Sequence, residues 1–244
     1  MNLGISQLSF NSNQELSLIA PILKANGINN IEIIPFKMDE YGKETEIIAK
    51  QNDLTLRSSQ SILFGSDIKD FTDEEFSKYI ISLFKSLSKK GTNLFVLGSP
   101  GQRKIYDEVK LSEQFRIIDE SIPSNCILCI EPNCKEYGGS YFFTVEEIAT
   151  FIRKNRYSKI KTMIDTHNII EEGDSPSSVF EEYVDLIYHV HVSENGLSPF
   201  IESEEHKKLA KSLKEYNYRG IVTYEVKPHE TLEDSLKKFN LIYK

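Results

Sequence analysis

Residues 126–131 have the sequence CILCIE, and residues 132–139, which follow, are PNCKEYGG. The short apolar side chains before Glu131 predict a strand that is buried on both faces and ends at Pro132 and Asn133. A carboxylate at the end of a buried strand is costly unless a partner neutralises it, and a metal ion is a common partner. Glu131 is therefore a candidate metal ligand.

Three later segments repeat this arrangement of a strand that ends in a metal-binding side chain. They are MIDTH at 163–167, YHVHVSE at 188–194 and VTYEVKP at 222–228, which contain Asp165, His191 and Glu225. The four candidates are 34, 26 and 34 residues apart (131 to 165, 165 to 191, 191 to 225), about one strand plus one helix each time. In a β/α barrel such strand ends meet at one mouth, so the spacing predicts a metal site there.

The rest of the chain alternates strands and helices in the same way. Its 244 residues are close to the ~250 of one (β/α)₈ barrel. We therefore predict an α/β fold, a single (β/α)₈ TIM barrel that forms one domain over residues 1–244, because no linker or composition break interrupts the pattern. No glycine-rich dinucleotide fingerprint follows the first strand, which disfavours an open sheet. Strands are expected at 3–9, 30–34, 54–58, 93–97, 126–131, 160–165, 186–192 and 220–226, and helices at 15–26, 43–52, 74–90, 111–122, from 144, 176–183, 202–216 and 232–243.

Composition and charge exclude several classes of protein. The net charge is −8, and lysines and arginines are scattered, whereas a nucleic-acid groove needs a concentrated basic face. No apolar run approaches the ~20 residues of a membrane span, and the first residues do not resemble a signal peptide. Cys126 and Cys129 are three residues apart, on opposite faces of a strand, which favours buried reduced thiols. We expect a cytoplasmic protein that binds no nucleic acid and no membrane; a homo-oligomer remains open.

Motifs along nearly the whole chain resemble one family, and they occur in the family's order. They are GIS (4–6), IEIIP (31–35), SSQSILFG (58–65), LGSPGQR (97–103), EPNCKEYGG (131–139), MIDTHNIIEEGD (163–174), HVHVSE (189–194) and YEVKP (224–228). This set resembles the xylose isomerase-like TIM-barrel superfamily of sugar isomerases and epimerases, to which D-tagatose 3-epimerase, hydroxypyruvate isomerase and endonuclease IV are related. The resemblance implies that Glu131, Asp165, His191 and Glu225 hold one divalent metal ion. It also implies that Glu131 and Glu225 are the catalytic acid and base.

The chemistry of such a site follows from its ligands. Three carboxylates and one imidazole suit Mn²⁺ best, with Mg²⁺, Co²⁺ and Zn²⁺ as alternatives. A carbonyl and a neighbouring hydroxyl of a sugar would fill the open positions, and the metal would stabilise the enediolate that forms when a proton leaves the carbon between them. Return of the proton to the same carbon gives epimerisation, and its return to the adjacent carbon gives isomerisation. We therefore expect an isomerase acting on a sugar or sugar phosphate.

Two further candidates for substrate binding come from the resemblance. His167 follows Asp165 closely, where relatives use a histidine to contact the substrate, although their spacing is usually one residue longer. Glu136 resembles a family carboxylate near the substrate, and an exposed loop acid is the alternative interpretation. The run Ser193–Leu197 lacks the arginine that many epimerases of the family have after the strand-seven histidine. The substrate, or its orientation, is therefore expected to differ from that of the free-ketose 3-epimerases.

Other candidates have a structural interpretation beside the functional one. Glu32, inside the second strand, can reach the pocket or pair with a lysine. Lys227 can bind a substrate oxygen or form a salt bridge at the barrel mouth. Arg103 lies in the loop 98–104, which is either a cradle for a phosphate or carboxylate or a simple strand-to-helix turn. His189 shares the inward face with His191 and is expected to be a hydrogen-bonded core histidine.

Three other functions compete with the isomerase. A lyase of the keto-inositol dehydratase type would use the same metal site and differ only in the group that leaves. A barrel without catalysis would only bind a sugar. A DNA-repair endonuclease of this superfamily uses three zinc ions and early histidines, but no histidine precedes Glu131 in this sequence.

Overall fold

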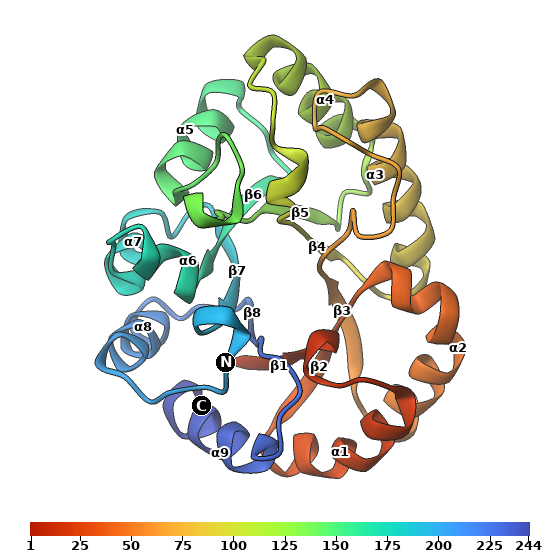
Figure 1. The fold of residues 1–244 in the computed structure, drawn as a ribbon, viewed down its shortest axis with the longest axis vertical. Helices are drawn as coiled ribbons and strands as arrows, with labels where there is room; N and C mark the ends of the chain where they lie inside the picture. Colours follow the sequence, from red (N-terminus) through yellow and green to blue (C-terminus); the bar gives the residue numbers. More distant parts are fainter.

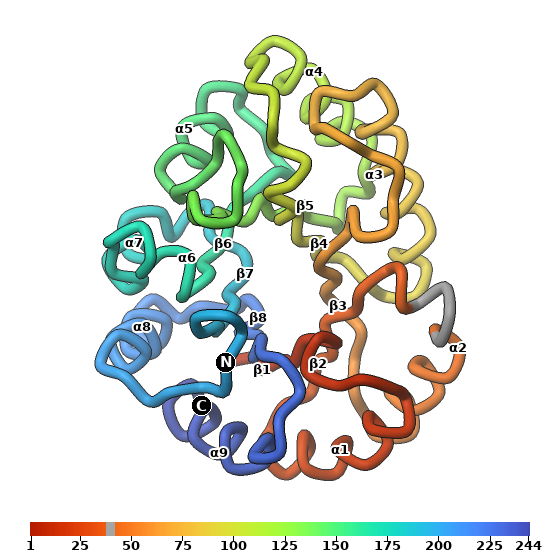
Figure 2. The backbone as a smooth tube through the Cα atoms, in the orientation of Figure 1, coloured from red at the N-terminus to blue at the C-terminus, as the bar shows by residue number. Residues whose placement is uncertain are grey.

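The computed structural model describes residues 1–37 and 42–244 (Figure 2). Its parallel strands close into one barrel in the order β1 to β8, and the helices surround this barrel (Figure 1). The predicted single (β/α)₈ TIM barrel is confirmed. The strands are β1 (Asn2–Ser6), β2 (Ile28–Ile33), β3 (Thr55–Ser59), β4 (Leu94–Leu97), β5 (Ile127–Ile130), β6 (Ile160–Asp165), β7 (Ile187–Val192) and β8 (Ile221–Tyr224).

The outer layer consists of helices whose starts follow from side-chain caps in the sequence. The hydroxyls of Ser12, Thr144 and Ser203 accept hydrogen bonds from backbone N–H groups in the first turns of α1, α5 and α8. The helix α6 was not expected, and α2 begins at Pro35 instead of near residue 43. The helices are α1 (Asn13–Ala25), α2 (Pro35–Gln51), α3 (Glu74–Leu87), α4 (Glu108–Ser121), α5 (Val145–Asn155), α6 (Thr166–Glu171), α7 (Pro176–Glu182), α8 (Glu204–Glu215) and α9 (Leu232–Tyr243). No helix in the described residues is both long and apolar enough to cross a bilayer.

The hydrophobic core lies mainly between the strands and the helices, and a smaller cluster fills part of the barrel interior. This smaller cluster joins Val96 of β4, Cys129 of β5 and Met163 of β6. Cys126 belongs to the outer core instead, so the two cysteines do lie on opposite faces of their strand. Cys126 and Cys129 are free and buried, as expected, and so is Cys134.

The other side of the barrel interior is polar. The fully or almost fully buried side chains there include Asn30, Glu32, Ser58, His189, His191 and Thr223. Buried polar groups are stable only when they are paired, so this side of the barrel depends on contacts between side chains across the interior. The strand register sets these contacts, because Asp165 of β6 lies beside His191 of β7, and His191 lies beside Thr223 of β8.

Candidate metal centre

The four residues predicted as metal ligands come together at the carboxyl ends of β5 to β8. One ligand atom from each of Glu131, Asp165, His191 and Glu225 lies within 4.8 Å of the others. His191 Nδ1 is 3.1 Å from Glu131 Oε1 and 3.0 Å from Glu225 Oε2. Glu131 and Glu225 follow β5 and β8, which are separated by β6 and β7, so they reach the imidazole from different sides.

Close packing with the end of β4 positions the Glu131 side chain. The Glu131 backbone N–H donates to the carbonyl of Leu97, which aligns the ends of β4 and β5. Its carboxylate lies against Gly98, where a Cβ atom would overlap Oε2. Asn133 Nδ2 donates a hydrogen bond of 3.1 Å to the same oxygen. The carboxylate therefore fits here only because residue 98 has no side chain.

Arg103 supports this corner through contacts with the backbone, so of its two expected interpretations the structure favours the structural one over the binding of an anion. Its side chain is fully buried, and its guanidinium donates to backbone carbonyls just after β4 and β5 and in the loop before α5. These bonds include 2.7 Å to Glu131 O, 2.5 Å to Gly98 O and 3.0 Å to Phe142 O. Burial lowers the pKa of Arg103 to about 10, so the group remains charged at neutral pH. Because its N–H groups donate to backbone carbonyls, Arg103 holds the loops around Glu131 in place.

Asp165 ends β6 and also caps the short helix α6. Its Oδ1 accepts hydrogen bonds from the Asn168 backbone N–H at 2.8 Å and from Ser193 Oγ at 2.9 Å. Burial, reinforced by the negative charges of Glu131 and Glu225, raises the pKa of Asp165 to about 8. Three carboxylates are thus crowded around one imidazole, an arrangement that a divalent cation would relieve.

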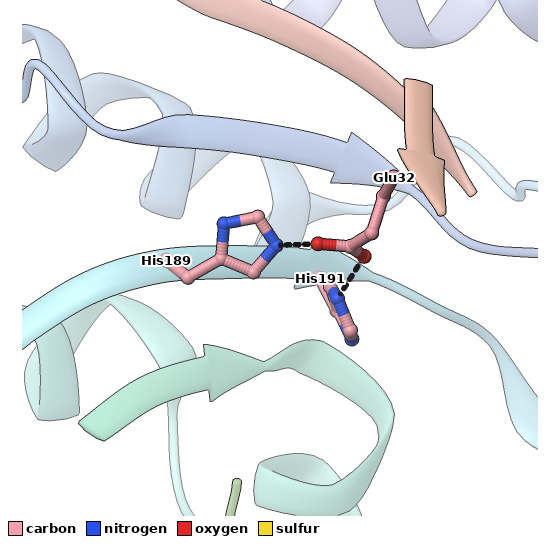
Figure 3. Close-up of side chains that lie close together, drawn as sticks. All are labelled: Glu32, His189 and His191. Carbon is pink, nitrogen blue, oxygen red and sulfur yellow. Dashed lines mark hydrogen bonds and ion pairs between the residues drawn. The ribbon is translucent and has the colours of Figure 1, made fainter. Parts of the chain in front are cut away.

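His191 is fully buried and contacts carboxylates through both ring nitrogens. Its Nδ1 faces the cluster, and its Nε2 is 2.6 Å from Glu32 Oε2 (Figure 3). Burial by itself would lower the pKa of His191, but the carboxylates of Glu225 and Glu32 raise it well above its ordinary value. Glu32 was expected to reach the pocket or to pair with a lysine; in the part of the chain that the structure describes, its ion-pair partners are instead two histidines. It lies between His191 and His189. His189 is buried and has a hydrogen-bonding partner in Thr223 Oγ1, as predicted.

The donor set fits a divalent metal ion. Carboxylate oxygens with one imidazole nitrogen are the ligands that Mn²⁺, Mg²⁺ and similar ions take in proteins, and no thiol is part of the cluster. Protons on Asp165 and His191 in the metal-free protein are those that a bound cation would displace. The residues that would hold the ion are Glu131, Asp165, His191 and Glu225.

A cavity of about 230 Å³ opens beside this cluster. Among the predicted site residues, Glu131, Asp165, Glu225 and His167 line it. Glu136 and Lys227 are exposed to solvent and are not among the residues that line it, so their contacts with a substrate stay predictions. The remaining lining residues are Leu8, Gln60, Ser61, Ser99, Pro100, Asn133, Tyr137, Asn168, Ser193 and Leu197.

Several of these lining residues were missed from the sequence. Gln60 and Asn133 are polar residues just after β3 and β5, the same signal that identified Glu131. Tyr137 reaches the cavity from the position next to Glu136, and its ring centroid is 6.2 Å from that of His167. Asn168 could not be placed because α6 was not expected; its Oδ1 accepts from the Cys134 backbone N–H.

With the barrel and its acidic cluster described, the chain can be compared with known proteins. Residues 21–241 match the model of the xylose isomerase-like TIM barrel family, and the chain belongs to this family. No curated protein matches the sequence significantly.

Solved structures with the same fold cover almost the whole chain. The 3-keto-D-glucoside 4-epimerase YcjR from E. coli superimposes with a TM-score of 0.79 and 17% identity, over 99% of this chain and 97% of its own. A D-psicose 3-epimerase from Clostridium cellulolyticum H10, solved with D-tagatose, gives 0.75 and 15% over 100% of both chains. An AP endonuclease of family 2 from Brucella melitensis gives 0.78 and 18% over 98% of both. At these identities the likeness establishes the fold.

Proposed function

We propose that this protein is a metal-dependent sugar isomerase or epimerase that uses Glu131 and Glu225 as its proton-transfer pair. The observation that supports this is the convergence of the two carboxylates on one imidazole nitrogen, beside a small cavity. A bound divalent cation, with Mn²⁺ the expected ion, would act as a Lewis acid toward the carbonyl and neighbouring hydroxyl of the substrate. The two epimerase structures above share the fold, which is consistent with this activity.

The two glutamates would divide the proton transfer between them. One carboxylate removes the proton from the carbon that lies between the carbonyl and the hydroxyl, so a C–H bond breaks and a carboxyl O–H bond forms. The second carboxylate lies on another side of the substrate and returns a proton to the opposite face, which inverts the carbon. Return of the first proton to the former carbonyl carbon, together with transfer of the hydroxyl proton to the former carbonyl oxygen, would instead exchange the positions of the carbonyl and the hydroxyl.

The lining of the cavity favours a small uncharged carbohydrate over a phosphate ester. Within the described residues that line it, hydrogen-bonding groups come from Gln60, Asn133, Tyr137 and His167, and no lysine or arginine is among them. A phosphate group is normally bound by arginine, lysine or a cluster of backbone N–H groups.

The three free, buried cysteines are consistent with a cytoplasmic enzyme.

A substrate panel in deuterated water tests the proposal. The protein is stripped of metal, reloaded with Mn²⁺ and incubated with free ketoses, aldoses, 3-keto-glycosides and the corresponding phosphates. We expect deuterium at the carbon next to the carbonyl together with a new epimer or isomer, and no reaction in the chelator-treated protein. Loss of water from the substrate would identify a lyase, and binding without exchange would identify a non-catalytic barrel; either result contradicts the proposal.

A further inference from the structure

A carboxylate deep in the barrel bridges the two inward-facing histidines of β7. Glu32 Oε1 is 2.7 Å from His189 Nε2, and Glu32 Oε2 is 2.6 Å from His191 Nε2. All three side chains are fully buried. Figure 3 shows Glu32 reaching from β2 to the two imidazoles of β7, with one oxygen directed at each ring. Since β1 and β8 separate these strands in the barrel, the contact is made across the interior and not along the sheet.

This geometry determines where the protons lie on His191. An ionised carboxylate can only accept hydrogen bonds, so an imidazole nitrogen 2.6 Å away must hold a hydrogen. The proton on Nε2 is thus donated in a hydrogen bond to Glu32. The nitrogen that can give up its proton and offer a lone pair is Nδ1, which faces Glu131 and Glu225.

Without Glu32 the opposite tautomer would be favoured. An Nδ1–H group could donate to Glu131 or Glu225, and Nε2 would then be the nitrogen without a proton. This arrangement satisfies the carboxylates but blocks the metal-facing lone pair. With Glu32 present it is unfavourable, because two acceptors without a hydrogen between them would lie 2.6 Å apart.

His189 completes the arrangement by holding the other oxygen of Glu32. Residues 189 and 191 are two positions apart on β7 and therefore share its inward face. Because His189 takes Oε1, the carboxylate plane is oriented and Oε2 is directed at His191. His189 does not belong to the four-residue cluster at the mouth.

We propose that Glu32 is a positioning residue of the metal centre, which, held by His189, commits His191 Nε2–H to a hydrogen bond and presents Nδ1 to the ion. The proposal rests on the metal-binding part of the proposed function. Carboxylates that accept from the second nitrogen of a ligating histidine fix the orientation of the ring and raise its basicity. Their loss typically weakens metal binding by about 10–100-fold.

The test uses Glu32→Gln, which keeps the size of the side chain and removes its charge. Mn²⁺ and Zn²⁺ affinities are measured by competition with a chelator of known affinity, and stability is measured by thermal unfolding without metal. Ser58→Ala is the matched control, since Ser58 is the fully buried β3 partner of Glu32 in register and hydrogen-bonds to Asn30. We expect Glu32→Gln to bind both ions about 10–100-fold more weakly and Ser58→Ala to bind them as the wild type does.

A second measurement needs no variant. Zn²⁺ is diamagnetic, so ¹⁵N NMR of the Zn²⁺-loaded wild-type protein can show which of the two ring nitrogens of His191 carries a proton. We expect a slowly exchanging Nε2–H and an Nδ1 shifted by metal, with faster exchange of Nε2–H in Glu32→Gln. A purely structural role would lower the unfolding temperature without changing these signals.

The outcomes separate this proposal from the proposed function. If the wild type binds no divalent ion, the metal site and the role of Glu32 both fail. If the wild type binds the ion and Glu32→Gln binds it equally well, only the role of Glu32 is overturned. Ligation through Nε2, or a proton on Nδ1 in the Zn²⁺-loaded wild type, overturns it as well, even if Glu32→Gln does not fold.

Discussion

The Glu131 carboxylate lies against the backbone of Gly98, so closely that a Cβ atom on residue 98 would overlap Glu131 Oε2. The overlapping atom is the end of a flexible side chain and not part of the backbone, so a Cβ atom on residue 98 can be accommodated by movement of the Glu131 carboxylate. Gly98 thereby couples the loop after β4 to the position of a metal ligand after β5.

Replacement of this glycine should affect metal binding more than folding. We expect Gly98→Ala to fold with nearly wild-type stability and to bind Mn²⁺ at least about tenfold more weakly, because the ligand is displaced. Gly101→Ala is the control from the same loop, where a Cβ atom would meet nothing within 4 Å. Equal Mn²⁺ affinities of the two variants would show that the Glu131 carboxylate can move without loss of metal affinity.

Arg103 should behave in the opposite way, as a residue that affects stability first. Arg103→Met removes the buried donors of the carbonyls of Gly98 and Glu131, and unsatisfied buried acceptors cost about 1–3 kcal/mol each. We expect the free energy of unfolding in urea to fall by roughly 2–4 kcal/mol. Arg116→Met is the comparison, since Arg116 forms exposed pairs with Glu113 and Glu120 on α4 and should change stability little. Similar losses in both variants would refute the structural role of Arg103.

Metal binding should release protons near neutral pH. In the metal-free protein burial and neighbouring carboxylates raise the pKa of Asp165 to about 8, and that of His191 is also raised. A cation must displace these protons, so its affinity should rise as the pH is raised through neutrality toward the pKa of Asp165. Each proton released makes this rise about tenfold per pH unit. Calorimetry at pH 7 in buffers of different ionisation enthalpy should show about one to two protons released per ion, and heats that do not depend on the buffer would contradict the prediction.

His167 and Glu136 were both expected near a substrate, but only His167 lines the cavity. We expect His167→Gln to lower kcat/KM by about 10–100-fold with Mn²⁺ affinity unchanged, because a substrate hydrogen bond is lost and no ligand is moved. Glu136→Gln should leave kcat/KM within about twofold of the wild type. Steady-state kinetics at saturating Mn²⁺ compare the two. An equal effect of both substitutions would show that the 134–138 loop adopts another position over the substrate.

The fold was predictable because each strand and helix has a local signal. The range of β6 and that of α9 were predicted without error, since β6 runs from Ile160 to a carboxylate at Asp165 and the apolar residues of α9 follow a regular helical period. The first strand was predicted to reach residue 9 but ends at Ser6, whose hydroxyl accepts from the Leu8 N–H and turns the chain. The six residues of α6 are too few to show a helical period.

The site was predictable where a single strand end determines it, and not where two distant strands meet. The position of Asp165 follows from β6 alone. The partners of Glu32 do not, because β2 and β7 are not neighbours and the sequence does not show how far a side chain reaches across the interior. The loop that contains Arg103 has the composition of an anion-binding loop, but the guanidinium is buried and donates to a backbone carbonyl.

The two glutamates can be distinguished by following proton exchange in each variant separately. Glu131→Gln and Glu225→Gln keep the shape of the side chain and one coordinating oxygen, but an amide cannot accept the substrate proton. At saturating Mn²⁺ we expect either change to lower kcat by about 10²–10⁴-fold, the usual effect of losing a general acid or base. Glu136→Gln, a charge removal on the loop after β5 that does not touch the cavity, is the control.

Exchange without turnover should then identify the face on which each carboxylate acts. If the protein is an epimerase with two bases, each variant should still exchange the proton of the epimer that faces its remaining carboxylate, and should fail to exchange that of the other epimer. The two variants should therefore show opposite preferences in deuterated water. Loss of exchange for both epimers in the same variant would instead indicate one base that serves both directions, as in isomerisation. Near wild-type exchange and turnover in both variants would place the base outside this pair, and His167, which lines the same cavity, would be the next residue to test.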